Sequence, residues 1–173
     1  KKRAGNVTIG VGNDGYHKAL FSYNTGKSET GWSSSFLMSR TAGSMYADGT
    51  KFEGYNYYFA LGYNPNSKHD FQFTITGAPQ WHHQRSFQST ISDYIKYGGT
   101  EEEPNRKYNQ NWGYLNGEEY AMTVNYYHKP VMSLNWDWKI TDATKLNSVA
   151  YASFGRGGGS GDFGRINSKS YTS

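Results

Sequence analysis

Four aromatic and basic side chains in the middle of the sequence are the residues best suited to hold a ligand. All lie between residues 79 and 120, a stretch without a regular apolar pattern: Trp81, Arg85, Trp112 and Tyr114. Aromatic planes beside hydrogen-bonding groups suit the recognition of a sugar or a flat chelate. Packing of a long loop against its neighbours would use the same residue types. The sequence therefore predicts that a ligand site, if the loop forms one, uses these four side chains.

The five histidines and the acidic run at residues 101–103 invite comparison with a metal site. His82 and His83 are adjacent, and adjacent side chains on a strand point to opposite faces. The i, i+4 spacing by which a helix gathers metal ligands is absent. Three consecutive glutamates in a loop are typical of a solvated acidic run. We therefore expect loop histidines, no metal site and no cofactor.

The glycine-rich run at residues 155–161 resembles neither a phosphate loop nor a nucleic-acid segment in its context. A phosphate loop requires a Lys-Ser/Thr pair and a following helix, and neither follows here. The run is better explained as a flexible loop. The sequence also holds no Ser/His/Asp arrangement, paired-carboxylate cleft or nucleophile elbow with supporting context. We expect a protein that is not an enzyme and does not bind nucleic acid.

The composition is polar and aromatic at once, which is unusual for a soluble domain. Tyr, Phe and Trp make up 17% of the 173 residues, while the mean hydropathy is −0.85. Disordered chains are poor in aromatics, so this polarity does not indicate disorder. No run of about 18 apolar residues is present, which excludes a transmembrane helix. Strands that alternate lipid-facing and water-facing residues would combine these traits.

Period-2 alternation is the strongest pattern in the sequence. Residues 55–63, 70–78 and 131–140 each place large apolar side chains on one face and polar ones on the other. No charge falls on the apolar face of these three strands. That matters because a Lys or Arg facing lipid at the midplane costs about 2–4 kcal/mol. A soluble antiparallel sheet would show the same alternation, but large Tyr and Trp residues at the strand ends resemble an interfacial girdle.

Weaker alternation predicts the remaining strands at residues 6–12, 18–25, 31–40, 121–129 and 146–154. Residues 121–129 and 131–140 share one parity, which predicts a single long strand bulged at Pro130, where a ladder donor is missing. The total is then seven strands.

The connections between these strands are expected to differ in length at the two ends of the sheet. Residues 26–30, 64–69 and 141–145 form short turns, whereas residues 41–54 and 79–120 form long loops and residues 13–17 are an exception. Short turns on one side and long extracellular loops on the other are typical of outer-membrane barrels.

An odd strand count leaves open edges, whereas closed barrels of this class have an even number of strands. We predict no strand in residues 155–173, so the chain is expected to be one part of a larger barrel whose further strands follow residue 173. Two alternatives stay open. The first is a complete small eight-stranded barrel with an adhesion or structural role, which requires a strand within residues 155–173. The second is a soluble carbohydrate-binding β-sandwich.

Five motifs follow one another over nearly the whole chain: residues 48–55 (DGTKFEGY), 77–85 (GAPQWHHQR), 111–118 (NWGYLNGE), 127–130 (YHKP) and 151–159 (YASFGRGGG). These motifs resemble those of TonB-dependent outer-membrane receptors of the Bacteroidetes type. The resemblance implies an all-β antiparallel meander, a partial transmembrane β-barrel with about seven of approximately 22 strands. Residues 1–173 would be the barrel portion that follows the plug domain, since Lys1, Lys2 and Arg3 are similar to the basic plug–barrel junction.

The resemblance also implies a function and partners. A receptor of this family resides in the cell outer membrane and imports a scarce nutrient, such as a siderophore or a glycan, with TonB-coupled energy. The partners would be membrane lipid, lipopolysaccharide, TonB through a plug and TonB box outside residues 1–173, and in some members a surface lipoprotein.

Overall fold

The structure is a computed structural model that describes residues 2–85, 88–161, 165–166 and 169–170. It confirms an all-β antiparallel fold. Its principal strands are β1 (Ala4–Val11), β2 (His17–Lys27), β3 (Trp32–Ser44), β4 (Lys51–Asn66), β5 (His69–Gly77), β6 (Gln80–His83), β9 (Val124–His128), β10 (Val131–Lys139), β11 (Lys145–Ser153) and β12 (Arg156–Gly159). The remaining elements are α1 (Ile91–Lys96), β7 (Trp112–Leu115), β8 (Glu118–Ala121), β13 (Arg165–Ile166) and β14 (Lys169–Ser170). No helix within the described residues is long and apolar enough to cross a membrane.

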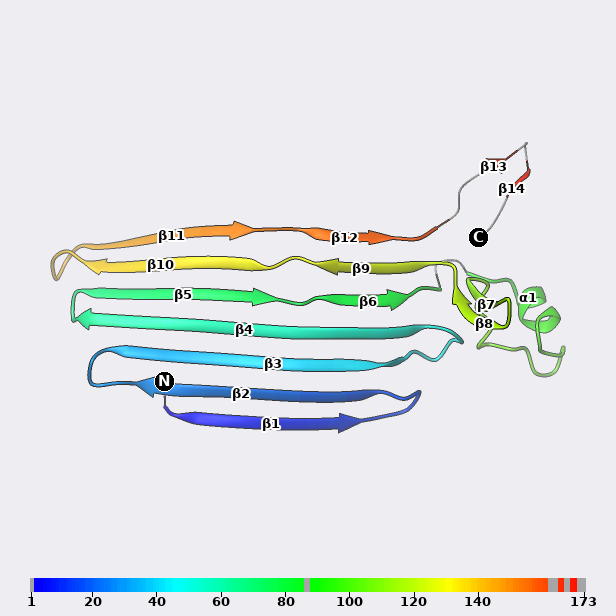
Figure 1. Cartoon of the computed structure of the whole chain (residues 1–173), viewed down its shortest axis with the longest axis horizontal. Coiled ribbons are helices and arrows are strands. Elements are labelled where there is room, and N and C mark those ends of the chain that lie inside the picture. The colour runs from blue at the N-terminus through cyan, green and yellow to red at the C-terminus, as the bar shows by residue number, and fades with distance from the viewer. Residues whose placement is uncertain (1, 86–87, 162–164, 167–168, 171–173) are drawn as a thin grey trace.

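The ten principal strands form one open sheet, in the order β1-β2-β3-β4-β5-β10-β11 (Figure 1). The sheet is seven strand lines wide, where a strand line is one strand or two strands that lie end to end. Three lines consist of two strands each, because β6 continues β5, β9 leads into β10 and β12 continues β11. The register does not change across these junctions: β6 pairs with β9 in the same register in which β5 pairs with β10. The predicted single strand over residues 121–140 is wrong in detail: Ala121 belongs to β8, and residues 124–139 form two strands, β9 and β10, which lie end to end in one register. The predicted bulge at Pro130 is wrong, since proline removes a donor here without adding a residue.

The predicted connections require corrections. β3 and β4 extend to residues 44 and 51, so their connection is six residues, 45–50, and not residues 41–54. Residues 79–120 are not one irregular loop but contain β6, α1, β7 and most of β8. Residues 155–173 are not without strands, because β12, β13 and β14 lie there. Glycine makes β12 possible: a Cβ on Gly158 would lie 2.9 Å from the Tyr126 hydroxyl of β9.

The two faces of the sheet differ as the alternation predicts. The register brings apolar side chains of neighbouring strands into common rows on one face, here called the apolar face. Its central rows contain Val7, Phe21, Tyr23, Phe36, Met38, Tyr57, Phe59, Leu61, Tyr63, Phe71, Phe73, Ile75, Met132, Leu134 and Trp136. The opposite, polar face carries residues such as Thr8, Ser22, Ser35, Asn56, Gln72, Thr74, Ser133 and Asn135.

Charge is nearly absent from the apolar band, which we define as the rows of the apolar face from Tyr57 to Tyr63 on β4. Among the described residues the exception is Arg3, which precedes the edge strand β1 and donates from Nε to the Tyr23 hydroxyl at 2.6 Å. Much of the apolar face is open to solvent, since Val7 is 67% exposed and Met38 64%. The described residues place no second layer of structure over it.

The ends of the sheet are also different (Figure 1). Residues 28–31, 67–68 and 140–144 connect strands at one end, which we call the turn end. Residues 12–16, 45–50 and 84–123 connect them at the other, the capped end. The most buried side chains of the described residues lie at the capped end: Asn109 and Asn111 are each 2% exposed, and Thr50 is 4% exposed.

Candidate functional site at the capped end of the sheet

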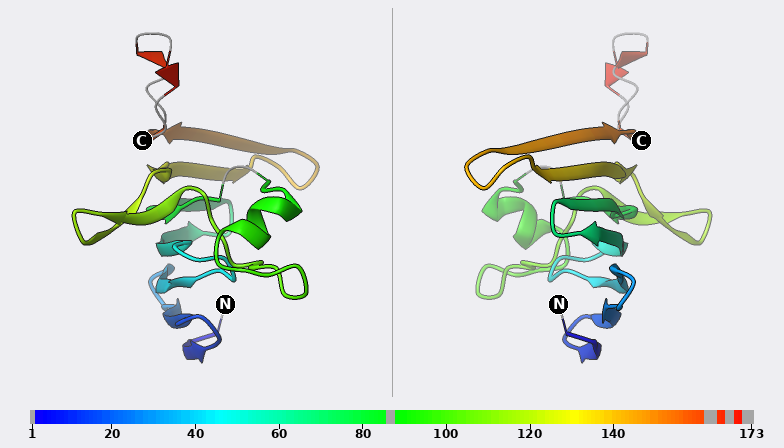
Figure 2. Two further views of the ribbon diagram at one scale, coloured as in Figure 1. Left: turned by 90° about the vertical axis from the view of Figure 1, so that its right-hand side faces the viewer. Right: turned by 90° about the vertical axis from the view of Figure 1, so that its left-hand side faces the viewer.

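A small folded unit, the cap, covers one end of the sheet and consists of residues 84–85 and 88–123. Figure 2 shows its two parts on opposite sides of the sheet, with α1 on one side and the β7–β8 hairpin on the other. Lys51 shares the parity of the apolar face and forms an ion pair with Glu119 of β8, which places the hairpin on the apolar side. Helix α1 therefore lies on the side of the polar face.

The cap is joined to the connection between β3 and β4, residues 45–50, by hydrogen bonds at Asp48. Asn109 donates from Nδ2 to the carbonyl of Asp48 at 2.9 Å, and the Asp48 N–H donates to the carbonyl of Lys107 at 2.9 Å. The Asn109 Oδ1 accepts the N–H of Asn111 at 3.0 Å. Buried polar groups stabilise a fold only when they are paired. This joint therefore fixes one relative arrangement of the cap and the connection.

A close aromatic contact completes the joint. Gly49 has φ +67°, and a Cβ there would lie 1.8 Å from Cδ1 of Trp112. The Trp112 Nε1 donates to Glu119 Oε1 at 2.8 Å, while Lys51 pairs with Oε2 of the same carboxylate. Hydrogen bonds from Lys51 and Trp112 hold the pKa of Glu119 below its usual value. Gly49 is thus required both by its backbone conformation and by the ring above it.

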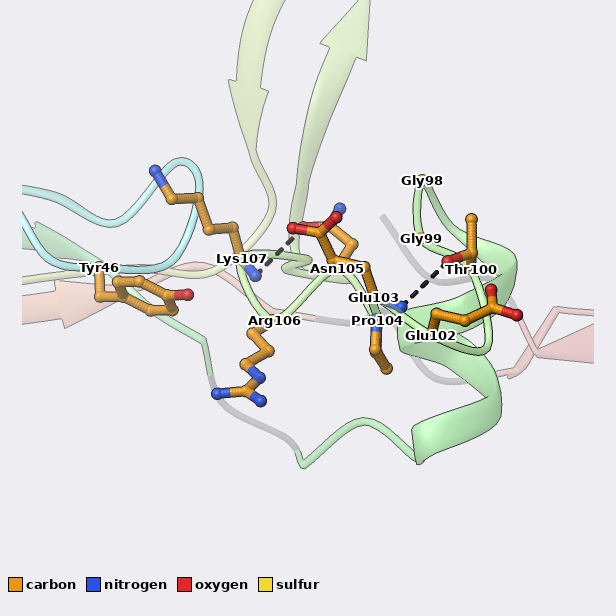
Figure 3. A pocket seen from close by; sticks show the side chains of 10 residues that line it. All are labelled: Tyr46, Gly98, Gly99, Thr100, Glu102, Glu103, Pro104, Asn105, Arg106 and Lys107. Atoms are coloured by element: carbon orange, nitrogen blue, oxygen red, sulfur yellow. Dashed lines mark hydrogen bonds between the residues drawn. The ribbon is translucent and has the colours of Figure 1, made fainter.

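Two hollows meet at Tyr46, which projects from the β3–β4 connection and is 58% exposed. One of about 600 Å³ is bordered by Met45, Tyr46, His82 and Arg85, among others. The other, of about 580 Å³, lies between Tyr46 and residues 98–107 (Figure 3). Lys107 Nζ lies 5.7 Å from the centre of the Tyr46 ring.

The chemistry around Tyr46 suits the binding of a ligand. An exposed aromatic ring lies beside amide, imidazole and guanidinium donors. In Figure 3 the charged side chains of Glu102, Arg106 and Lys107 point in different directions, so they do not converge on one reacting atom. Hydrogen bonds inside the segment, from the Glu103 N–H to Thr100 Oγ1 at 3.0 Å, shape the wall of the hollow.

The four predicted ligand-binding residues are divided among three places. Arg85 borders the hollow at Tyr46, donating from Nη1 to the carbonyl of Arg106 at 3.2 Å and from Nη2 to the Tyr94 hydroxyl. Trp81 lies on the apolar face, and its Nε1 donates to Glu53 Oε2 at 3.3 Å. Trp112 and Tyr114 remain together in the hairpin, with ring centroids 5.6 Å apart.

Sequence reasoning missed Tyr46, which the structure places between the two hollows. The residue belongs to the stretch 41–54 that was expected to be a long loop, and nothing in its neighbours indicates a contact with residues 98–107.

The expectation of loop histidines is wrong, because all five lie on strands, in β2, β5, β6 and β9. His69 accepts from Trp136 Nε1 at 3.1 Å near the turn end, whereas Nε2 of His128 contacts the Tyr57 hydroxyl at 2.8 Å. Within the described residues, no group of three His, Cys, Asp or Glu side chains could hold a metal ion.

A charged cluster lies on the apolar face just beyond the apolar band, at the capped end. Arg40 donates from Nε to Glu53 Oε1 at 2.6 Å, and the Tyr55 hydroxyl donates to the same oxygen at 2.5 Å. The Arg40 Nη1 lies 2.9 Å from Nε2 of His17.

Comparisons with protein-family models, with curated proteins and with solved structures match nothing. The function of this chain must therefore be inferred from its residues and their geometry.

Proposed function

We propose that this chain is a segment of an outer-membrane β-barrel that belongs to a TonB-dependent importer of a scarce nutrient. The observation that carries the proposal is the apolar band. It is exposed, crosses the seven strand lines and is bordered by aromatic side chains at both ends.

The exposure of the apolar face favours lipid over water. Ile9 is 78% exposed and Val11 83%, and Phe59, Phe73 and Leu134 are between 36% and 49% exposed. Soluble monomers rarely expose contiguous apolar patches larger than a few hundred Å². A β-sandwich would bury such a face under a second sheet. In the part of the chain that the structure describes, the two other sheets have only two strands each.

The apolar band together with the adjoining border row of Tyr55 approaches the height of a bilayer core. From Tyr55 to Tyr63 the strand rises by about 27 Å at roughly 3.4 Å per residue. A strand tilt of about 40° reduces this to about 21 Å, close to the apolar height of about 25 Å in outer-membrane barrels.

Aromatic side chains lie at both borders of the band, as in interfacial girdles. Near the turn end, Trp32 stacks on Tyr63 with ring centroids 4.2 Å apart, and Trp136 stacks on Phe71 at 5.9 Å. Near the capped end, Trp81, Tyr126 and Tyr55 occupy the corresponding border. The polar face would then line a wet interior.

The importer is favoured over a structural barrel by the cap and by the resemblance to TonB-dependent receptors. The cap closes one end of the sheet and borders the hollows at Tyr46, so an incoming ligand would first be held there. Two of the resembling motifs belong to this arrangement: residues 48–55 include the connection joined to the cap, and residues 77–85 lead from β5 through β6 into it.

Position-specific probes test the barrel assignment. The 173 residues contain no cysteine, so single cysteines can be introduced and labelled with an environment-sensitive fluorophore. In the intact polypeptide reconstituted into liposomes, a probe at Phe73→Cys or Leu134→Cys should be quenched by a lipid-borne quencher. The neighbouring Thr74→Cys and Ser133→Cys probes should not be quenched. Equal quenching at both parities, or at neither, would overturn the proposal.

A binding assay tests the importer assignment separately. The intact polypeptide should bind the periplasmic domain of TonB in a detergent pull-down, and deletion of its TonB box should abolish binding. A barrel that passes the quenching test without binding TonB would leave the membrane assignment standing and remove the importer.

A further inference from the structure

The hollow of about 600 Å³ beside Tyr46 is bordered by both histidines of β6. The β3–β4 connection contributes the apolar part of its border, through Met45, Tyr46 and Ala47. The volume lies within the range of about 300–1,000 Å³ that is usual for ligand pockets. The two histidines are bonded differently, and this difference indicates which class of ligand the hollow can hold.

His83 has one ring nitrogen that no described residue engages in a hydrogen bond. Its Nδ1 lies 3.2 Å from the carbonyl oxygen of Gly49. A carbonyl only accepts, so Nδ1 carries the proton and Nε2 of the neutral ring keeps its lone pair. The ring also contacts that of Trp81, with centroids 5.2 Å apart. A histidine that binds a metal usually donates its other ring nitrogen to a carbonyl in this way, which fixes the ring and makes it more basic.

The carboxylate that interacts with His83 at longer range, Glu119, does not take up this nitrogen. Its Oε1 accepts from Trp112 Nε1 at 2.8 Å, and its Oε2 pairs with Lys51. Both oxygens are thus bonded elsewhere, and Nε2 of His83 is left for a ligand.

His82 lacks such a nitrogen. Its Nε2 lies 3.3 Å from the side-chain amide nitrogen of Gln84. An amide nitrogen only donates, so the lone pair of His82 Nε2 is already occupied. The two adjacent histidines therefore form a matched pair, of which one can bind a metal and the other cannot.

Arg85 adds an uncompensated positive charge to the same hollow. Its two printed partners are neutral, since Nη1 donates to the carbonyl of Arg106 and Nη2 to the hydroxyl of Tyr94. In the part of the chain that the structure describes, no carboxylate forms an ion pair with it. A guanidinium has five N–H donors, so Arg85 retains donors for a carboxylate of a ligand.

A basic nitrogen, an aromatic ring, an apolar border and a guanidinium together fit a flat iron chelate with carboxylate arms. Its iron would meet the histidine, its plane the ring of Tyr46, and its arms the guanidinium. A bare metal ion would need several protein ligands, and no group of three His, Cys, Asp or Glu side chains is present among the described residues. A chelate supplies the other ligands itself and requires one histidine.

We propose that this hollow binds an iron porphyrin, such as haem, as the nutrient that is imported. His83 Nε2 ligates the iron, Tyr46 stacks on the macrocycle, and Arg85 pairs with a carboxylate arm. The porphyrin is a transported substrate here and not a resident cofactor. The proposal rests on the proposed function, which makes the capped end the side where the nutrient arrives, and it names the class of that nutrient.

The test titrates the intact polypeptide in mild detergent with ferric protoporphyrin and with metal-free protoporphyrin, which has the same plane and carboxylates. Ferric protoporphyrin should acquire the absorption spectrum of histidine-ligated haem. His83→Ala should remove this spectrum and weaken binding on the order of tenfold or more, since groups that only support a metal ligand already contribute about 10–100-fold. Its affinity for metal-free protoporphyrin should not change, which also shows that the hollow is still formed.

Two controls separate ligation from a structural role. His82→Ala is the matched variant and should keep both the spectrum and the affinity. Imidazole added to His83→Ala should restore the spectrum, because it can occupy the place of the missing ring.

The role of Arg85 is tested by changing the ligand. The dimethyl ester of ferric protoporphyrin lacks the carboxylate charges and should bind the wild type on the order of tenfold more weakly, because hydrogen bonds to charged groups are lost. In Arg85→Gln this difference between acid and ester should disappear.

The outcomes distinguish this proposal from the proposed function. Equal effects of His82→Ala and His83→Ala, or an unchanged spectrum in His83→Ala, would overturn the porphyrin site. If the alternating quenching and the binding of TonB persist in that case, the importer stands and carries another nutrient. If the porphyrin binds as expected but TonB does not, the site stands and the importer is removed.

Discussion

Replacing Gly49 should release the cap from the sheet. An alanine at φ +67° costs about 1–2 kcal/mol from its left-handed backbone alone. Its Cβ would also lie 1.8 Å from Cδ1 of Trp112, so the indole must leave its place. The hydrogen bond from Trp112 to Glu119 is then lost, at a further cost of about 1 kcal/mol.

Together these terms weaken the docking of the cap by about 2–3 kcal/mol, or roughly 30- to 150-fold in its opening equilibrium. Hydrogen exchange of the intact protein measures this directly. The amides of residues 107–112 and 45–50 should exchange faster by that factor in Gly49→Ala, while those of β4 and β10 keep their protection.

Two further glycines serve as matched controls. Gly15 has φ +71°, but nothing lies within 4 Å of the place that a Cβ would occupy, so Gly15→Ala isolates the backbone cost. Gly113 adjoins Trp112 and also has open space at that place, so Gly113→Ala should leave exchange unchanged. The two substitutions are compared by the increase in amide exchange that each causes around its own position. If the increase in Gly49→Ala is no larger than that in Gly15→Ala, the contact with Trp112 contributes nothing and the reasoning is refuted.

Three other perturbations follow from the same contacts. The lowered pKa of Glu119 means that its ion pair with Lys51 fully stabilises the docked cap at pH values above the usual pKa of 4.5, and that this contribution is lost as the pH falls through the lowered pKa. Proteolysis of the cap should therefore accelerate in that pH window. Glu119→Gln should remove this pH dependence, whereas Glu118→Gln should not. Leu134→Arg places a charge on the apolar band and should make the free energy of folding in lipid less favourable by about 2–4 kcal/mol. The control Asn135→Arg, on the polar face, should be tolerated. Equal folded yields of the two variants in vesicles would contradict the assignment of faces. Thr90→Ala removes the capping box of α1 and should destabilise that helix by about 1 kcal/mol. Amide hydrogen exchange should become faster, and only in residues 91–97. Protection equal to that of the wild type would refute the capping role of Thr90.

The parts of the fold that the sequence predicts are the strands with one polar and one apolar face. β5 and β10 alternate strictly because Phe71, Phe73 and Ile75 meet Trp136, Leu134 and Met132 across the ladder. The sequence did not predict β12, because its pairing depends on glycines that leave room for the aromatic side chains of β9. Whether that room is needed depends on the partner strand and not on the sequence of β12 itself. The joint at Asn109 escaped for the same kind of reason, since Asp48 is distant in sequence and only the folded chain brings the two together. The four predicted ligand residues shared a stretch of sequence, but β6 directs Trp81 to the apolar face while Arg85 turns toward α1.

The interruptions of the sheet provide an argument for its environment that does not use hydrophobicity. β5, β10 and β11 all break at one level, where Pro79 and Pro130 lack an N–H for the ladder. A backbone group without a partner is tolerated in water or among lipid headgroups, but not in the hydrocarbon of a bilayer. The breaks begin at the row of Tyr57 and extend to the row of Tyr55, which is where the apolar band ends and Arg40 and Arg156 begin. On the other side of the band, the ladder irregularity between Tyr63 and Asn66 lies beside the aromatic border near the turn end. Backbone pairing and side-chain polarity thus change at the same rows. This coincidence supports the proposed barrel, because a strand that leaves a membrane must change both properties at the same depth.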